Sequence, residues 1–171
     1  MLAREQTKLI GYDSDFNELL KIFNESNLPN KIIFSGNKGI GKSTLVYHFI
    51  NYIFSMNEEF SYDSKNKIIN KENKSYKLVN NLCHPNFFKI EISKEKKNID
   101  IAQIREMILF TNKSSLNNNF KIILIDNVEY LNKNSTNALL KVVEEPNSKV
   151  LFFLIHDISK NILSTLKTEL D

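Results

Sequence analysis

The chain is poor in the residues that build disulfides and metal centres. It has a single cysteine, Cys83, so no disulfide can form within it, and its three histidines stand far apart at positions 48, 84 and 156. We therefore expect no zinc and no chemistry centred on a metal held by Cys and His. No apolar run approaches the roughly 18 residues that cross a bilayer, and the first residues lack the apolar stretch of a signal peptide. These absences predict a cytoplasmic protein with no membrane partner.

The excess of charge of either sign is small. The 23 Lys and Arg residues against 20 Asp and Glu residues leave a net charge of +3, which is too mild to indicate nucleic-acid binding by itself. The length of 171 residues and the 42% hydrophobic content predict one globular domain over residues 1–171. Only Arg4 and Arg105 are arginines, and Lys and Asn are abundant throughout, so runs of Lys or Asn carry little functional information.

Apolar patterns alternate between strand-like runs and helical spacing. The expected strands are 31–35, 87–92, 121–125 and 150–155, and the expected helices are 13–27, 44–54, a helix that begins after Asp100 or Asn98, and 135–145. Runs that are apolar on both faces and alternate with helices are typical of a parallel sheet covered on two sides. The predicted fold class is therefore α/β, with three layers, a mainly parallel sheet and helices on both faces.

One stretch departs from this pattern. Residues 57–81 are rich in Lys, Asn, Ser and Glu, and their few apolar residues show no sustained period. We expect a mobile insertion that is helical in part.

The glycines are few, and three of the four fall within six positions. Residues 36–43 read Gly-Asn-Lys-Gly-Ile-Gly-Lys-Ser, which fits G-x-x-x-x-G-K-[ST] at every fixed position, between a predicted strand and a predicted helix. Such a P-loop brings backbone N–H groups and the positive end of a helix to a phosphate. We expect Lys42 to reach the β- and γ-phosphates and Ser43 to coordinate Mg²⁺. The predicted nucleotide-binding residues of the loop are Gly36, Asn37, Lys38, Gly39, Ile40, Gly41, Lys42, Ser43 and Thr44.

A P-loop needs a second acidic group near the magnesium ion, normally at the end of a neighbouring strand. Asp126 directly follows the apolar run 121–125, so it lies at the carboxyl edge of the sheet, where α/β proteins bind ligands. An aspartate after a strand is as often a simple cap, but after a complete P-loop it predicts a Mg²⁺ ligand. The expected cofactors are ATP or ADP with Mg²⁺, and the candidate catalytic residues are Asp126 and Glu129.

Four segments together carry a family resemblance. They are Leu9-Ile10-Gly11, the P-loop, Ile125-Asp126-Asn127-Val128-Glu129, and Asn-Ala-Leu-Leu-Lys-Val-Val-Glu-Glu-Pro at 137–146. The combination resembles the clamp-loader branch of the AAA+ ATPases, and within it the bacterial DNA polymerase III delta prime subunits. The resemblance runs from about residue 9 to residue 167, and its last segment is more selective than the P-loop.

The resemblance implies an AAA+ nucleotide-binding domain in a ring of clamp-loader subunits that loads the sliding clamp on primed DNA. The other ring subunits are then direct partners, the clamp and the DNA are reached through the complex, and the lid and collar domains lie outside this chain. It also implies that the adenine lies over Ile10 and Gly11, and that His156 is either a polar sensor of the γ-phosphate or a strand-end residue that meets solvent.

Two departures from the family pattern concern hydrolysis. The family usually has Ser-Arg-Cys where this chain has Thr168-Glu169-Leu170, so the arginine that reaches a neighbour's nucleotide is replaced by an acid. The carboxylate that usually follows the strand-end aspartate is replaced by Asn127, and Glu129 is a poor substitute. We therefore expect ATP to be bound and hydrolysed weakly or not at all.

Two other functions remain open from the sequence. A self-sufficient P-loop ATPase or nucleotide kinase would use Lys42, Asp126 and Glu129 for phosphoryl transfer. Another AAA+ replication or repair ATPase would contact DNA directly through a basic stripe, but the lysines of 65–77 lie in a stretch that is typical of a solvated surface. The rate of ATP turnover separates the first of these from the clamp-loader hypothesis.

Overall fold

A computed structural model describes residues 2–93, 96–115, 120–144, 149–162 and 166. Two compact units make up the chain. One comprises Met1–Pro29 and Gly41–His84, and the other comprises Asn30–Ile40 and Pro85–Asp171. We call them the helical unit and the sheet unit and describe each by itself.

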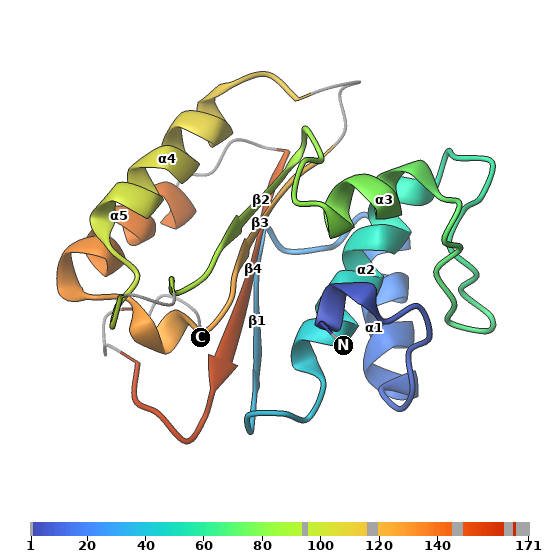
Figure 1. The fold of residues 1–171 in the computed structure, drawn as a ribbon, viewed down its shortest axis with the longest axis horizontal. Helices are drawn as coiled ribbons and strands as arrows, with labels where there is room; N and C mark the ends of the chain where they lie inside the picture. The colour runs from blue at the N-terminus through green and yellow to red at the C-terminus, as the bar shows by residue number, and fades with distance from the viewer. Residues whose placement is uncertain (1, 94–95, 116–119, 145–148, 163–165, 167–171) are drawn as a thin grey trace. The chain divides into compact units, whose positions relative to one another are not determined.

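The described residues of the sheet unit form four strands: β1 (Lys31–Gly36), β2 (Phe87–Ile90), β3 (Lys121–Ile125) and β4 (Val150–Asp157). Their order is β1-β4-β3-β2, and every neighbouring pair is parallel (Figure 1). All four predicted strands are present. β2 ends two residues earlier than predicted because its last residue pairs with the end of β3, so residues 91 and 92 have no partner strand there. β4 is longer because its last residues pair with the end of β1.

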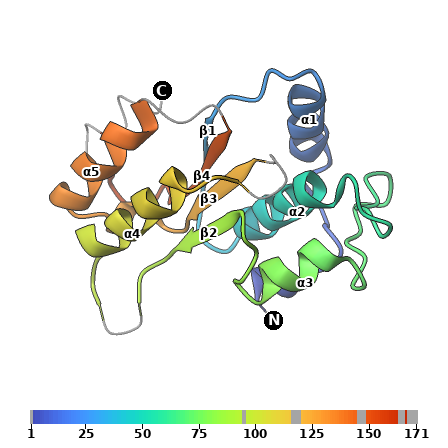
Figure 2. The same cartoon turned by 90° about the horizontal axis from the view of Figure 1, so that it is seen from above.

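Two helices of the same unit, α4 (Ile101–Asn112) and α5 (Lys133–Glu144), pack side by side against the sheet (Figure 2). Their apolar side chains form one core with alternate residues of the central strands, such as Ile123 and Phe152. The intervening residues Ile122 and Phe153 are also fully buried, so neither face of β3 and β4 is exposed to solvent. The predicted α/β class with a parallel sheet is confirmed.

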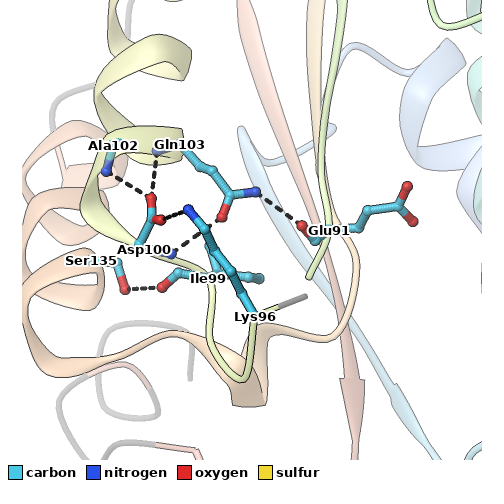
Figure 3. Close-up of polar contacts among 7 residues, drawn as sticks. All are labelled: Glu91, Lys96, Ile99, Asp100, Ala102, Gln103 and Ser135. Carbon is cyan, nitrogen blue, oxygen red and sulfur yellow. Dashed lines mark hydrogen bonds and ion pairs between the residues drawn. The ribbon is translucent and has the colours of Figure 1, made fainter. Parts of the chain in front are cut away.

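The start of α4 shows how local sequence fixes an element. The Asp100 carboxylate accepts hydrogen bonds from the backbone N–H groups of Ala102 and Gln103, at 3.0 and 3.2 Å, and the Gln103 side chain accepts one from the Asp100 N–H at 3.2 Å (Figure 3). This reciprocal capping box decides between the two predicted caps in favour of Asp100 over Asn98. The Gln103 amide also donates to the carbonyl of Glu91, which ties the helix to the chain that leaves β2.

The helical unit contains α1 (Asp13–Asn24), α2 (Lys42–Ser55) and α3 (Lys74–Asn80). The predicted helix 13–27 is present as α1, which ends three residues earlier than predicted, and the predicted helix 44–54 is present as α2, which begins two residues earlier and ends one residue later. Most residues of α2 are buried, and Phe49 and Ile50 are completely so. Phe16 of α1 is also completely buried.

The segment 57–81 belongs to the helical unit. It contains α3, which confirms the expected helical part, and it buries Tyr62, Ile69, Tyr76 and Val79. Intervals of 7 and 3 are compatible with a helix face, but only Tyr76 and Val79 lie in a helix, whereas Tyr62 and Ile69 lie outside helices and strands. Spacing alone therefore did not identify these residues as buried. The mobility of the segment stays a prediction.

Among the described residues, no helix is long and apolar enough to cross a membrane.

Candidate nucleotide-binding site

Three strand ends of the sheet unit meet at one edge, because β1, β3 and β4 are parallel. Asp126 follows β3, and its backbone N–H donates to the carbonyl of Ile90 at 2.9 Å. Its carboxylate accepts a hydrogen bond from the amide of Asn127 at 3.2 Å. Asn127 itself has φ 61° and ψ 64°, the left-handed region that Asn tolerates better than most residues. The structure thus places Asp126 at the carboxyl edge of the sheet, as the sequence predicts.

Glu129 lies in the short 3-10 helix Val128–Tyr130, and its carboxylate is engaged by the end of β4. The Glu129 Oε2 accepts a hydrogen bond from the backbone N–H of Asp157 at 3.3 Å. This contact gives Glu129 a structural task, the joining of the loop after β3 to the last residue of β4. Its predicted catalytic task stays a prediction.

His156 pairs in register with Ser35 of β1. Its Nε2 lies 3.0 Å from the carbonyl oxygen of Lys160. Because a carbonyl can only accept, Nε2 carries the proton, and Nδ1 then accepts from the Ser35 hydroxyl at 3.4 Å. Both ring nitrogens of His156 therefore have protein partners, and a sensor role would require one of these contacts to be exchanged.

The P-loop passes from the sheet unit to the helical unit between Ile40 and Gly41. In the sheet unit, residues 37–40 are exposed, and Gly39 has φ +85° with nothing within 4 Å of the position of a Cβ. In the helical unit, Gly41 has φ +96° and precedes α2 without any side-chain hydrogen bond to cap the helix. No acidic residue lies in the first turn of α2. A helix start without a side-chain cap or an acidic residue in its first turn fits an anion, so these residues fit a phosphate.

Lys42 and Ser43 form the first turn of α2. Lys42 is only 8% exposed, whereas Lys38 of the same loop is exposed. Ser43 and Thr44 are half-buried. The described residues include no group of three or more His, Cys, Asp or Glu side chains that could hold a metal ion. The Mg²⁺ ligands predicted at Ser43 and Asp126 stay a prediction.

The segment predicted to meet the adenine lies before α1. Ile10 is 81% exposed, and Gly11 has φ +73° with open space where a Cβ would be. The next residue, Tyr12, places its ring 3.3 Å from the position of a Cβ on Gly41. Burial and the Asp15 charge raise the pKa of Tyr12. The sequence reasoning missed Tyr12, although an aromatic residue directly after Ile10-Gly11 was a signal available to it. Within the helical unit, Tyr12 brings this segment to the start of α2.

The predicted departure at Thr168, Glu169 and Leu170 lies outside the described residues.

Comparisons with known proteins agree in pointing to one family. A family model described as DNA polymerase III, delta subunit, matches residues 12–169. The chain is 31% identical to a DNA polymerase III subunit delta' from Pseudomonas aeruginosa over 97 residues, which is 57% of this chain and 30% of that protein. It is 28% identical to a subunit delta' from Buchnera aphidicola subsp. Schizaphis graminum over 153 residues, 90% of this chain and 44% of that protein.

A subunit gamma from Buchnera aphidicola subsp. Acyrthosiphon pisum is 32% identical over 136 residues, 77% of this chain and 35% of that protein. Among solved structures, a DNA polymerase III gamma subunit-related protein from Thermotoga maritima matches with a TM-score of 0.59 and 20% identity, over 90% of this chain and 43% of that one, which shows the fold. The chain spans less than half the length of each of these curated relatives.

Proposed function

The chain belongs to the DNA polymerase III delta subunit family, and we propose that it is the ATP-binding part of a clamp-loader subunit, which helps to load the sliding clamp on primed DNA during DNA replication. The observation that carries this proposal is the P-loop that follows β1 and leads to the uncapped start of α2. Its partners are the other subunits of a hetero-oligomeric ring, and it reaches the clamp and the DNA through that complex in the cytoplasm.

Different residues of the chain would bind the phosphates, the Mg²⁺ ion and the base of ATP. The first-turn N–H groups of α2 and the Lys42 ammonium neutralise the phosphates, and Ser43 and Asp126 provide oxygen atoms of the kind that Mg²⁺ prefers. The exposed Ile10 offers apolar surface to the base. The nucleotide supplies the negative charge that these groups are arranged to hold.

The residues after β3 support a site that retains ATP rather than hydrolysing it. The Asn127 amide cannot accept a proton from an attacking water, and the Glu129 carboxylate already accepts the N–H of Asp157. In a self-sufficient ATPase or kinase, Glu129 would have to act as the base while its Oε2 accepts the N–H of Asp157, so this contact favours the binding role.

Calorimetric titration with Mg²⁺-ATP and Mg²⁺-ADP tests the proposal. Lys42→Ala should lower the affinity at least about tenfold because it removes a charge-assisted contact to phosphate. Lys71→Ala is the control, since this exposed lysine lies outside the loop. Its effect should stay within about threefold. Circular dichroism checks that both variants fold. Equal affinity of wild type and Lys42→Ala would refute the site.

Assembly needs a separate measurement. The chain should co-elute in size-exclusion chromatography with purified clamp-loader subunits of the same organism. Failure to associate in the presence or absence of ATP would reject the clamp-loader part of the proposal and leave nucleotide binding intact.

A further inference from the structure

Residues 10–12 form a short arch in the helical unit. The arch is bounded by Leu9, which is only 5% exposed, and by Asp13, the first residue of α1. Between these ends, Gly11 and Tyr12 both have positive φ, at 73° and 57°. The arch therefore joins the buried Leu9 to the first residue of α1, and its first residue, Ile10, is exposed.

A single residue, Lys67, holds both ends of the arch. Its backbone carbonyl accepts the Leu9 N–H at 3.0 Å. Its ammonium group pairs with the Asp13 carboxylate, and this hydrogen bond and charge hold the pKa of Asp13 below its ordinary value. The Lys67 side chain is 12% exposed, so it lies against the protein along most of its length.

Lys67 is in turn fixed by the hairpin that carries it. The backbone groups of Asp63 and Ile68 exchange two hydrogen bonds of 3.0 and 3.1 Å, and the Asp63 carboxylate accepts two more from Asn66. Ile69 N–H donates to the carbonyl of Thr7 at 2.8 Å. The hairpin and the N-terminal segment therefore form an antiparallel bridge, and the carbonyl of Lys67 has a defined position in it.

We propose that Lys67 is a positioning residue for the base end of the nucleotide site. It fixes both ends of the arch before the ligand arrives, so less conformational freedom is lost when the adenine settles on Ile10 and Gly11. Lys67 contacts the two ends of the arch, and the arch meets the P-loop through the Tyr12 ring at Gly41, so its contribution concerns the base more than the phosphates. The inference rests on the function proposed above.

The affinities of the 171-residue chain for two ligands distinguish an effect on base binding from an effect on phosphate binding. Mg²⁺-ATP reports on both ends of the site, whereas inorganic tripolyphosphate with Mg²⁺ reports on the P-loop alone. Lys67→Met should weaken ATP binding about fivefold, the upper effect of a partly exposed ion pair, and leave tripolyphosphate binding unchanged. Lys67→Arg should restore ATP affinity because it renews the pair with Asp13. Lys71→Met is the matched control in the same segment, since Lys71 is exposed.

Asp13→Asn removes the same ion pair by changing the other partner, so it should also weaken ATP binding and leave tripolyphosphate binding unchanged. This second variant keeps the test decisive if one of the two proteins fails to fold. Thermal unfolding of each protein verifies the fold. An equal loss of both ligands, or no loss of ATP affinity in either variant, overturns the role of Lys67. Wild-type chain that binds neither ligand overturns the proposed nucleotide site and this inference together, so the two failures are distinct.

Discussion

Acidification should destabilise the helical unit through His48. This residue is completely buried on α2, and its Nε2 lies 3.1 Å from the carbonyl oxygen of Gln6. The carbonyl can only accept, so Nε2 carries the proton, and Nδ1 accepts from the Tyr62 hydroxyl at 2.8 Å. Both ring nitrogens are thus satisfied in the neutral form, and a second proton on the ring would remove the acceptor that Tyr62 needs.

The size of the effect follows from the difference between the pKa of His48 in the folded chain and its pKa in the unfolded chain. Burial lowers the pKa of His48 in the folded chain from 6.5 to about 4. Between those pH values the unfolded chain binds a proton that the folded chain does not, so stability rises with pH across this window. The contribution of His48 is complete above about pH 6.5 and is lost as the pH falls toward 4. At about 1.4 kcal/mol for each pH unit, the loss is about 3 kcal/mol at pH 4.

Urea unfolding at half-unit steps between pH 7.5 and 4.5 measures this loss. His48→Gln is the control, because an amide can donate to Gln6 and accept from Tyr62 without titrating in this range. Other titrating groups, including His84, whose pKa burial lowers to about 4, act equally in both proteins. The difference between the two curves therefore isolates His48. Parallel curves for the two proteins would refute the reasoning.

Two further predictions concern the sheet unit. Asp100→Ala should lower the urea midpoint of unfolding because α4 loses its cap. Asn98→Ala, at an exposed position, is the control and should have little effect, and equal midpoints for the two variants would contradict the prediction. The chain alone should turn over ATP negligibly in a coupled steady-state assay, and turnover on the order of 1 per second would instead favour a self-sufficient ATPase. In that case Glu129→Gln should lower the rate and leave the ATP affinity unchanged.

The sequence predicted the sheet unit well because its strands are short apolar runs, of which β3 and β4 are buried along nearly their whole length. Residues 121–125 were delimited correctly since polar residues follow them and the whole run is buried. The errors at the ends of β2 and β4 have a common cause. Where a strand stops depends on how far its neighbour extends, and the register with β1 and β3 cannot be read from the sequence of one strand.

The candidate site was predictable where a fixed spacing carries the chemistry. A strand precedes the P-loop, a helix follows it, and Asp126 follows the parallel strand β3, as the sequence predicts, while the binding roles of these residues stay a prediction. The tasks of Glu129 and His156 were not predictable, because both depend on partners from other segments. Glu129 meets the backbone of Asp157, and His156 meets Lys160, contacts that no spacing in the sequence encodes.

Lysines show this limit most clearly. The abundance of Lys in residues 57–81 argued for a solvated surface, and for the exposed Lys71 that interpretation agrees with the structure. Lys67 is the same residue type in the same stretch, yet its side chain is 12% exposed. Its backbone carbonyl accepts the Leu9 N–H, and its ammonium group pairs with the Asp13 carboxylate. The difference comes from the hairpin that Asp63 closes four residues before it, which puts Lys67 at φ 54° and directs it toward the arch. The interpretation from composition therefore holds for the exposed Lys65, Lys71, Lys74 and Lys77 and fails at Lys67, whose side chain makes a tertiary contact.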